Sequence, residues 1–484
     1  MRRTARAASL SLLAALALAA VTTPPATAQS PPALEPPKAA LARLDSLQRM
    51  VQEEETRVQH ASGVEANWDR LARAWFQVGD HARAAASLGR ARALGGREED
   101  TALLSGRVAR SEGRFNEAIA ALERAARLAP DDWQVHEDLG LAFYLAGRLP
   151  EAAEQWERAH AQPGTGSPAR PGLLPAMRAA GPHAYAVSGR GRERLALIAG
   201  GGPGAMVISA RLDGKGPYRL RIDTGSPEVV LGRSLARELG LATLAGGETG
   251  GFVGEVPVRF DYAVLDSLTL GTTTLARFPV AISDHPALAS DAGIRGTLGL
   301  EALRRFRFCL HAPGGALWLE PLPAAADTGR AAKAAADTTR PAWAPDGAVT
   351  HRVPVLLRGT HLLVAYGHVN GGPDRPFLLD TGSPGIGLSA PMSTLAEAGI
   401  TVDTTQTHTG TSAAGEVAFY RFPVGRLCVG GACRDSLAGV YGIFPPRLEL
   451  NPNFRLAGIV SSGFLSRYRV GVDLSRGEVW LVEP

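Results

Sequence analysis

Two short stretches of this 484-residue sequence place an aspartate in the same setting. Asp223 opens the run Asp-Thr-Gly-Ser-Pro at 223–227, and Asp380 opens an identical run at 380–384. Each run follows apolar, strand-like residues, and its Gly, Ser and Pro are typical of a tight turn. Two carboxylates brought face to face repel each other when both are charged, so such a pair keeps one proton and can act as acid and base together. One Asp-Thr-Gly is a common turn, and it is the repetition that indicates chemistry.

The sequence around the two aspartates is duplicated. At an offset of 157 residues, 206–210 aligns with 363–367, and further matches keep the same order to the end of both copies. Each copy alternates apolar and polar residues between Gly-containing turns, which predicts β strands. Both copies end in a strand with a tryptophan, Trp318 in the first and Trp480 in the second. Such a strand suits a sheet between the lobes or the core of its own lobe, and the core is the interpretation we favour.

Both copies resemble the retropepsin-like aspartic proteases, the family of the retroviral enzymes and their bacterial relatives. That family carries two apolar residues before Asp-Thr/Ser-Gly, as in Leu378-Leu379-Asp380, whereas the first copy has the polar Arg221 at one of these positions. The resemblance covers residues 194–321 and 348–484. It implies two all-β acid protease barrels that form a pseudo-dimer, with Asp223 and Asp380 as the catalytic residues.

The resemblance also implies supporting roles for the turn residues. The threonine hydroxyls are expected to hydrogen-bond across the two loops beneath the carboxylates. The glycines permit the tight backbone, and the serines are expected to hydrogen-bond the outer carboxylate oxygens. These residues form three matched pairs: Thr224 with Thr381, Gly225 with Gly382, and Ser226 with Ser383.

Each lobe of this family also carries a glycine-bearing flap hairpin that covers the substrate. In the first copy the candidate flap contains Gly251, Phe252 and Gly254, and in the second it contains Ser412 and Gly415.

A later motif of two apolar residues and a glycine supports the catalytic loop in this family. The first copy has it as Thr297-Leu298-Gly299. The second copy has Ile459-Val460-Ser461, with serine where glycine is expected. This departure concerns the loop support of the second lobe and leaves its carboxylate in place.

A different pattern precedes the two lobes. Apolar residues recur at three- and four-residue spacing, as in helices. Small residues recur at a spacing of 34, with Gly79, Gly113 and Gly147 as one such series. This is the period of tetratricopeptide (TPR) repeats, which the segment 65–165 resembles. Such repeats stack into a curved solenoid whose concave face binds peptides or partner proteins, and a spacer or dimerisation arm is the alternative.

The N-terminus predicts export. Arginines at positions 2, 3 and 6 precede an apolar run at 7–21, and Ala26-Thr27-Ala28 forms a small-residue cleavage site. This is the pattern of a Sec-type signal peptide, so we expect a periplasmic or extracellular protein with no membrane attachment after cleavage. An uncleaved anchor is the alternative.

Cysteines and charges limit the remaining chemistry. Cys428 and Cys433 flank a Gly-Gly turn, so they are a candidate disulfide in an oxidising compartment or two independent small residues. The histidines are scattered and no Cys-x-x-Cys pair occurs, so no metal or other cofactor is expected. The chain has three lysines and no dense basic block, which argues against a nucleic-acid partner.

The sequence therefore predicts a multidomain protein of α plus β class, with an N-terminal α-helical TPR solenoid followed by the two duplicated lobes. The expected parts are a signal peptide at 1–28, the TPR domain at 37–165, a linker at 166–193, the first lobe at 194–321, a linker at 322–347 and the second lobe at 348–484. We expect the lobes to pair within one chain, although a linker of this length also permits pairing between chains.

The expected function is an aspartic endopeptidase that hydrolyses peptides or unfolded proteins at acidic to mildly acidic pH, with a possible protein partner on the repeats. One alternative is a scaffold that binds peptides without cutting them. Another is a protease restricted to its own chain or to one partner, with 322–347 as a cleavage site.

Overall fold

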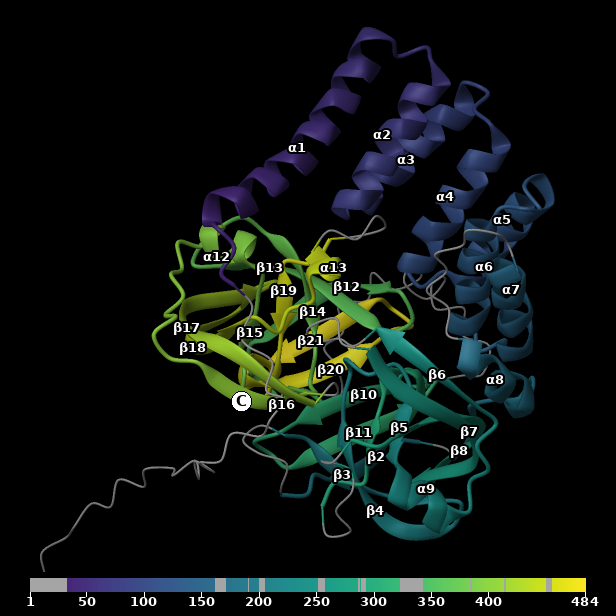
Figure 1. Ribbon diagram of the computed structural model, residues 1–484, viewed down its shortest axis with the longest axis vertical. Coiled ribbons are helices and arrows are strands. Elements are labelled where there is room, and N and C mark those ends of the chain that lie inside the picture. Colours follow the sequence, from purple (N-terminus) through teal and green to yellow (C-terminus); the bar gives the residue numbers. More distant parts are fainter. Residues whose placement is uncertain are drawn as a thin grey trace, which may run out of the picture.

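A computed structural model of the protein shows a helical domain seated on two β-rich lobes (Figure 1). The structure describes residues 33–161, 171–189, 191–199, 205–250, 257–285, 288, 293–322, 343–383, 385–412, 415–449 and 455–484. The expected signal peptide at 1–28 lies outside these residues, as does most of the expected second linker. Among the described helices, none is both long enough and apolar enough to cross a membrane.

The helical domain consists of a leading helix and three helical hairpins, as the 34-residue period predicts. Its elements are α1 (Pro37–His60), α2 (Glu65–Val78) with α3 (His81–Ala93), α4 (Glu98–Ser111) with α5 (Phe115–Leu128), and α6 (Trp133–Leu145) with α7 (Leu149–Ala161). Gly79, Gly113 and Gly147 stand at the turn of each hairpin with φ of 93°, 77° and 80°, a left-handed conformation that glycine adopts without strain. The alanines that recur at the same period are fully buried between the helices.

The segment after the solenoid packs onto the first lobe. It forms η1 (Pro171–Leu173), α8 (Leu174–Ala180) and β1 (Ala186–Ser188), all within the stretch expected to be a linker. Leu173 and Met177 are fully buried, and η1 lies against the first lobe. The high Gly, Pro and Ala content of this stretch is typical of a linker, but its few large apolar residues attach it to the lobe.

The first lobe is a closed barrel of six strands with a flanking hairpin. Its strands lie in the ring order β8-β5-β9-β4-β3-β7, and β7 pairs with β8 to close the ring. The strands are β3 (Val207–Leu212), β4 (Lys215–Ile222), β5 (Val229–Gly232), β7 (Pro257–Leu270), β8 (Thr273–Ser283) and β9 (Gly296–Leu298), with β6 (Ala245–Gly250), α9 (Arg233–Leu239) and α10 (Leu300–Leu303) beside them.

The second lobe repeats this barrel. Its ring order is β18-β15-β19-β14-β13-β17, closed by the pairing of β17 with β18, so each strand has its counterpart in the first lobe. The strands are β13 (Leu362–Val369), β14 (Arg375–Leu379), β15 (Leu388–Ser389), β17 (Gly415–Val429), β18 (Ala432–Tyr441) and β19 (Gly458–Val460), with β16 (His408–Ser412), α12 (Met392–Glu397), α13 (Pro446–Glu449) and α14 (Ser462–Leu465) beside them. The duplication predicted from sequence is therefore confirmed at the level of fold.

One sheet joins the two lobes. Its strands, in order, are β12 (Thr350–Arg358), β21 (Glu478–Val482), β20 (Arg469–Asp473), β10 (Phe306–His311), β11 (Ala316–Pro321) and β2 (Glu193–Ala196). β10 of the first lobe and β20 of the second pair antiparallel at the junction. The Trp-bearing strands β11 and β21 belong to this sheet, so our preference for the core of each lobe was wrong. A strand buried in either place has the same apolar pattern, and the sequence does not separate the two.

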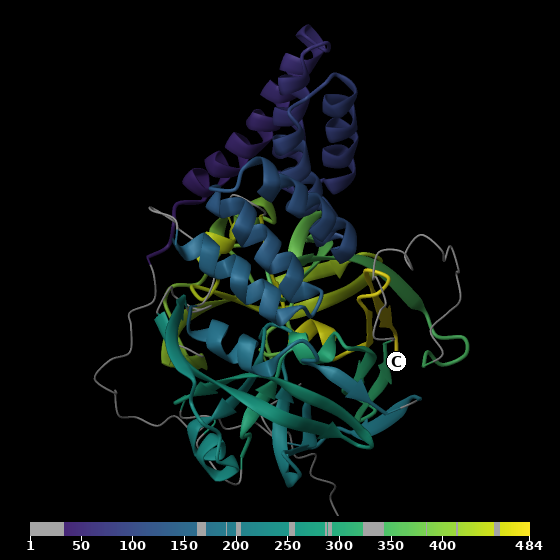
Figure 2. The same ribbon diagram turned by 90° about the vertical axis from the view of Figure 1, so that its right-hand side faces the viewer.

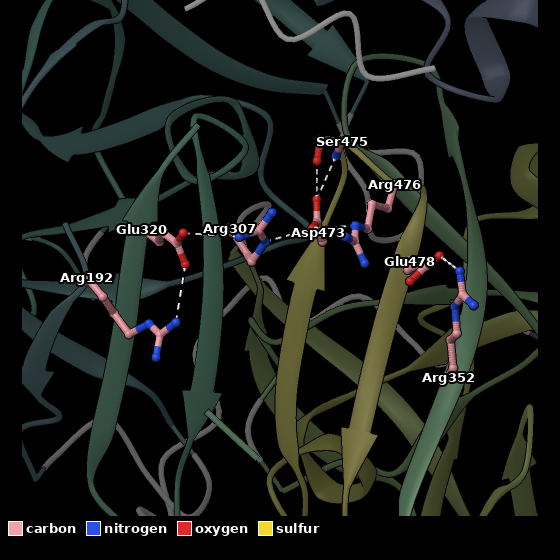
Figure 3. A network of polar contacts seen from close by, with 8 residues as sticks. All are labelled: Arg192, Arg307, Glu320, Arg352, Asp473, Ser475, Arg476 and Glu478. Atoms are coloured by element: carbon pink, nitrogen blue, oxygen red, sulfur yellow. Dashed lines mark hydrogen bonds and ion pairs between the residues drawn. The ribbon is translucent and has the colours of Figure 1, made fainter. Parts of the chain in front are cut away.

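Polar side chains hold the same junction together. The Arg307 guanidinium of the first lobe donates to Oδ2 of Asp473 in the second lobe at 2.7 Å (Figure 3). Asp473 is 3% exposed, so its charge is largely removed from water and depends on these partners. Arg307 also pairs with Glu320 of its own lobe at 3.2 Å. The lobes are therefore joined within one chain by both backbone and ionic contacts.

Candidate active site

The two aspartates stand at equivalent strand ends. Asp223 follows β4, which pairs in parallel with β9, and Asp380 follows β14, which pairs in parallel with β19. The backbone N–H of Asp223 donates to the carbonyl of Leu298 at 3.1 Å, and that of Asp380 donates to the carbonyl of Val460 at 2.9 Å. A backbone hydrogen bond to the neighbouring strand of the barrel therefore fixes the main chain of each aspartate.

The threonines beside the aspartates link the two lobes. The Thr224 hydroxyl donates to the Leu379 carbonyl at 3.1 Å and accepts from the Thr381 N–H at 3.1 Å. The Thr381 hydroxyl makes the reciprocal pair, with the Ile222 carbonyl at 3.2 Å and the Thr224 N–H at 3.1 Å. Both side chains are buried. These four hydrogen bonds form the cross-loop arrangement that the resemblance implied.

The glycines bring each loop against the opposite carboxylate. A Cβ atom at Gly225 would lie 2.6 Å from Oδ1 of Asp380, and one at Gly382 would lie closer still to Asp223. These distances are well below van der Waals contact, so any larger residue would force the two loops apart. The Asp-Thr-Gly spacing thus allows two carboxyl groups from different lobes to meet.

The Asp223 and Asp380 carboxyl groups lie in contact and keep one proton between them. Burial raises the pKa of Asp223 to about 8, together with the nearby charge of Asp380 and a hydrogen bond between the two carboxyls. The charge of Arg221 opposes this effect in part, as does the N–H of Gly225, which donates to Asp223 Oδ1 at 2.9 Å. The charged form of Asp223 is therefore disfavoured.

The Asp380 carboxyl group has more hydrogen-bond donors around it than Asp223. Burial raises its pKa as well, but four hydrogen bonds to the charged form lower it. The Gly382 N–H donates to Oδ1 at 2.7 Å, the Ser383 hydroxyl donates to Oδ2 at 3.1 Å, and Asp223 and the Gly225 N–H supply the other two. The surroundings of the pair are therefore asymmetric and favour the charge on Asp380.

The two serines of the repeated motif do not behave alike. Ser383 bonds the outer oxygen of its aspartate as expected, whereas the Ser226 hydroxyl donates to the Glu228 carbonyl at 3.1 Å. The expectation for Ser226 is corrected accordingly. Its hydroxyl is within reach of a backbone carbonyl two residues ahead, and it bonds there instead.

The loop support of the second lobe is intact despite its serine. Ser461 occupies the position of Gly299, and its N–H donates to the Gly387 carbonyl at 3.1 Å. The Ser461 hydroxyl is buried with no hydrogen-bond partner among the described residues. The backbone N–H of Asp380 donates to the carbonyl of Val460, which is the residue before Ser461, so serine in place of glycine at 461 does not interrupt this hydrogen bond.

Each lobe extends a hairpin from its barrel at the expected flap. In the second lobe β16 pairs with β17, and Ser412 and Gly415 face each other as the last described pair. In the first lobe β6 pairs with β7 as far as Gly250 and Pro257. The other flap candidates, Gly251, Phe252 and Gly254, lie outside the described residues.

The remaining candidate residues are the two cysteines of the second lobe. Cys428 and Cys433 face each other across β17 and β18 and are joined by a disulfide with a Cα–Cα distance of 4.1 Å. Among the described residues no group of three or more His, Cys, Asp or Glu side chains is arranged to hold a metal ion.

Sequence reasoning missed a buried cluster beside the loop that carries Asp223. Glu228 and Glu301 are 2% and 1% exposed, and Arg304 is 9% exposed. A comparison of the two copies could have found this cluster, because Gly387, Gly463 and Ser466 occupy the matching positions in the second lobe.

Comparisons with known proteins agree with both parts of the chain. A family model described as aspartyl protease matches residues 208–302, and a tetratricopeptide repeat model matches residues 103–168. No curated protein matches the sequence.

The protein is also similar to solved structures at low identity. Basic 7S globulin from soybean is 11% identical over 61% of this chain and 97% of its own, with a TM-score of 0.36. A MamA protein and a MamA RS-1 double mutant are 22% and 20% identical over 25% of this chain and 70% and 68% of theirs, with TM-scores of 0.22 and 0.23. These scores are too low to support an argument. The two family matches and the repeated barrel show that the chain contains tetratricopeptide repeats and an aspartyl-protease-like domain.

Proposed function

We propose that the protein is an aspartic endopeptidase that hydrolyses peptide bonds with a water molecule activated by Asp223 and Asp380. The observation that carries the proposal is the contact between two buried carboxyl groups, supplied by two lobes of one chain, which keep one proton between them. A binding surface has no need of such a pair, because holding two buried carboxyls together is unfavourable.

The asymmetry of the pair assigns a role to each residue. The Asp380 carboxylate takes a proton from water as the oxygen attacks the scissile carbonyl carbon, and Asp223 gives its proton to the carbonyl oxygen. The result is a neutral tetrahedral diol, with Asp380 now protonated and Asp223 charged. Collapse of the diol returns one hydroxyl proton to Asp223, while Asp380 protonates the leaving amine. Both residues finish in their starting states.

The substrate in this proposal is an extended peptide between the lobes. The hairpins β6–β7 and β16–β17 offer backbone donors and acceptors to a peptide that lies beneath them, as in other strand-addition complexes. The helical repeats are a surface for protein interaction. The N-terminal signal pattern supports a location of the mature protein in the periplasm or outside the cell.

The experiment is digestion of a proteome-derived peptide library by the purified mature protein across a pH series. Asp223→Asn and Asp380→Asn variants serve as controls, because an amide of the same shape removes the acid or the base without removing side-chain volume. Cleavage products that appear with the wild type and are lost with either variant support the proposal. Equal cleavage by wild type and both variants would reject it.

A further inference from the structure

An arginine, Arg221, stands two residues before Asp223 in the strand that leads to it. The pairing of β4 with β9 continues up to the N–H of Asp223, so the chain is still extended there. Side chains two residues apart in a strand point to the same face, which places Arg221 on the face of β4 from which Asp223 emerges. The charge of Arg221 reaches the Asp223 carboxyl and opposes the rise in its pKa. Arg221 therefore lies beside the two carboxyl groups without forming part of the pair.

The neighbours of Arg221 on this face come from the two adjacent strands. Val207 of β3 and Thr297 of β9 are its register partners, and side chains directly opposite each other share one face of a sheet. Val207 is fully buried in a small apolar cluster with Leu288 and Ile294. Arg221 and Thr297 are only half-buried. Two polar side chains thus lie at the accessible edge of an apolar cluster, close to the catalytic pair.

Both polar side chains lack a partner within the part of the chain that the structure describes. The Arg221 guanidinium makes no hydrogen bond or ion pair there, and its Nε is shielded from water. The Thr297 hydroxyl oxygen is shielded as well and has no hydrogen bond. Polar groups that are removed from water without a partner cost free energy. The arrangement is therefore satisfied only when a ligand supplies the partners.

The second lobe shows the same position without unpaired groups. The registers of β14 with β13 and β19 match those of the first lobe, and they place Leu378 and Ile459 at the positions of the arginine and the threonine. Both residues are buried in an apolar cluster that includes Phe444 and Leu448. The barrel therefore accepts an apolar residue at this position, and the fold does not require the arginine of the first lobe.

The chemistry of a guanidinium indicates which ligand would satisfy it. Arginine is charged at every pH at which the protein is folded, and its planar N–H donors match the two oxygens of a carboxylate. In an extended peptide the side chains on either side of one bond point to opposite faces. Only one of the two substrate residues that flank the scissile bond can therefore reach Arg221.

We propose that Arg221 is a specificity-determining residue that binds the carboxylate of an aspartate or glutamate side chain next to the scissile bond, with the Thr297 hydroxyl as a further donor. The substrate class is then peptides with an acidic residue on one side of the cleaved bond. This inference rests on the proposed protease function and deepens it. Pairing with Arg221 also offsets the repulsion between the substrate carboxylate and the charge of the catalytic pair.

The test uses the full-length mature protein, because the helical domain lies against both lobes (Figures 1 and 2). Its probe is a library of synthetic peptides made as matched pairs, with Glu or Gln at the central residue. The wild type is expected to cleave the Glu peptides with a kcat/KM about 10- to 100-fold higher, the factor for a hydrogen bond between charged groups. Arg221→Leu, which copies the second lobe, is expected to lose this preference.

Two further variants separate the charge of Arg221 from general effects of substitution. Arg221→Lys keeps the charge and is expected to retain a preference for Glu, weaker than that of the wild type because lysine binds a carboxylate as a single point charge. Arg211→Leu removes an exposed arginine of the adjacent strand β3, which donates to the carbonyls of Gly214 and Gly216 at 3.3 and 3.5 Å, and should leave the preference unchanged. The preference of the wild type should also disappear below about pH 4, where the substrate glutamate takes up a proton.

Binding to the Asp380→Asn protein measures the same selectivity without cleavage. We expect the Glu peptides to bind about tenfold or more tightly than their Gln partners, and Arg221→Leu in the same background to remove the difference. Equal affinity for the two kinds of peptide, binding of neither, or an unchanged preference in Arg221→Leu would overturn the inference. If the wild type binds Glu peptides selectively but cleaves none, the proposed protease function fails and the carboxylate site stands, so the two failures are distinguished.

Discussion

The hydrogen bonds that cross between the lobes beneath the carboxylates are open to a direct perturbation, Thr224→Val. Valine keeps the branched shape and removes the hydroxyl. That hydroxyl donates to the Leu379 carbonyl and accepts from the Thr381 N–H, each at 3.1 Å, and it has no access to water. The change therefore leaves two buried backbone groups of the second lobe without their partner.

The expected cost follows from the number of groups left unpaired. One buried donor or acceptor without a partner costs about 1–3 kcal/mol, so the two together cost about 2–6 kcal/mol. Displacement of the catalytic loops is expected as well, because the same bonds set the distance between the carboxylates. A shift on the order of 1 Å lowers kcat by about 100-fold.

Urea unfolding and steady-state peptide cleavage measure these two effects separately. Thr224→Ser is the matched control, because it keeps the hydroxyl and removes only a methyl group. We expect the serine variant to stay close to wild type in both assays. If Thr224→Val unfolds at the wild-type urea concentration and keeps its kcat, the cross-loop bonds do not hold the site together and the reasoning is refuted.

Four further predictions concern charge. The kcat/KM profile should rise with pH as Asp380 ionises and fall near pH 8 as Asp223 loses its proton. Because the pKa of Asp223 is raised in the folded protein, its protonated carboxyl stabilises the fold fully below about pH 4, and this stabilisation is lost as the pH rises through about 8. The free energy of unfolding of Asp223→Asn should therefore depend less on pH in this window than that of the wild type. Ser383→Ala removes a donor to the charged carboxylate, which raises the pKa of Asp380 and should move the acid limb to higher pH. Arg307→Met should lower the free energy of unfolding by about 2 kcal/mol, because Asp473 at the lobe junction loses a charged partner but keeps its other hydrogen bonds. An unchanged urea midpoint would contradict a stabilising role of this ion pair.

The repeated features of the fold and site were predictable from sequence. The identical runs at Asp223 and Asp380 indicated two equivalent loops, and the 34-residue spacing of glycines such as Gly79 and Gly147 indicated helical hairpins. Both signals work because a repeated backbone geometry demands the same small residue at the same place. The matching order of strands in the two barrels follows from this duplication.

Features that depend on contacts between distant segments were not predictable. A strand such as the one with Trp480 has the same apolar pattern in a lobe core and in the sheet between lobes. Ser226 and Ser383 share a motif, yet the Ser226 hydroxyl donates to the Glu228 backbone carbonyl and the Ser383 hydroxyl to the Asp380 carboxylate. The segment that holds Met177 reads as a spacer because its few apolar residues stand among Gly, Pro and Ala.

In the proposed mechanism one acid and one base, from two lobes of the same chain, form a single site. Mixing equal amounts of Asp223→Asn and Asp380→Asn chains tests whether the lobes pair within a chain, because each chain keeps one intact lobe. If the lobes pair within a chain, every site lacks one carboxyl group, and peptide cleavage by the mixture equals the sum of the two inactive variants. Recovery of a substantial fraction of wild-type cleavage on mixing would show that intact lobes from different chains combine, and would contradict the account.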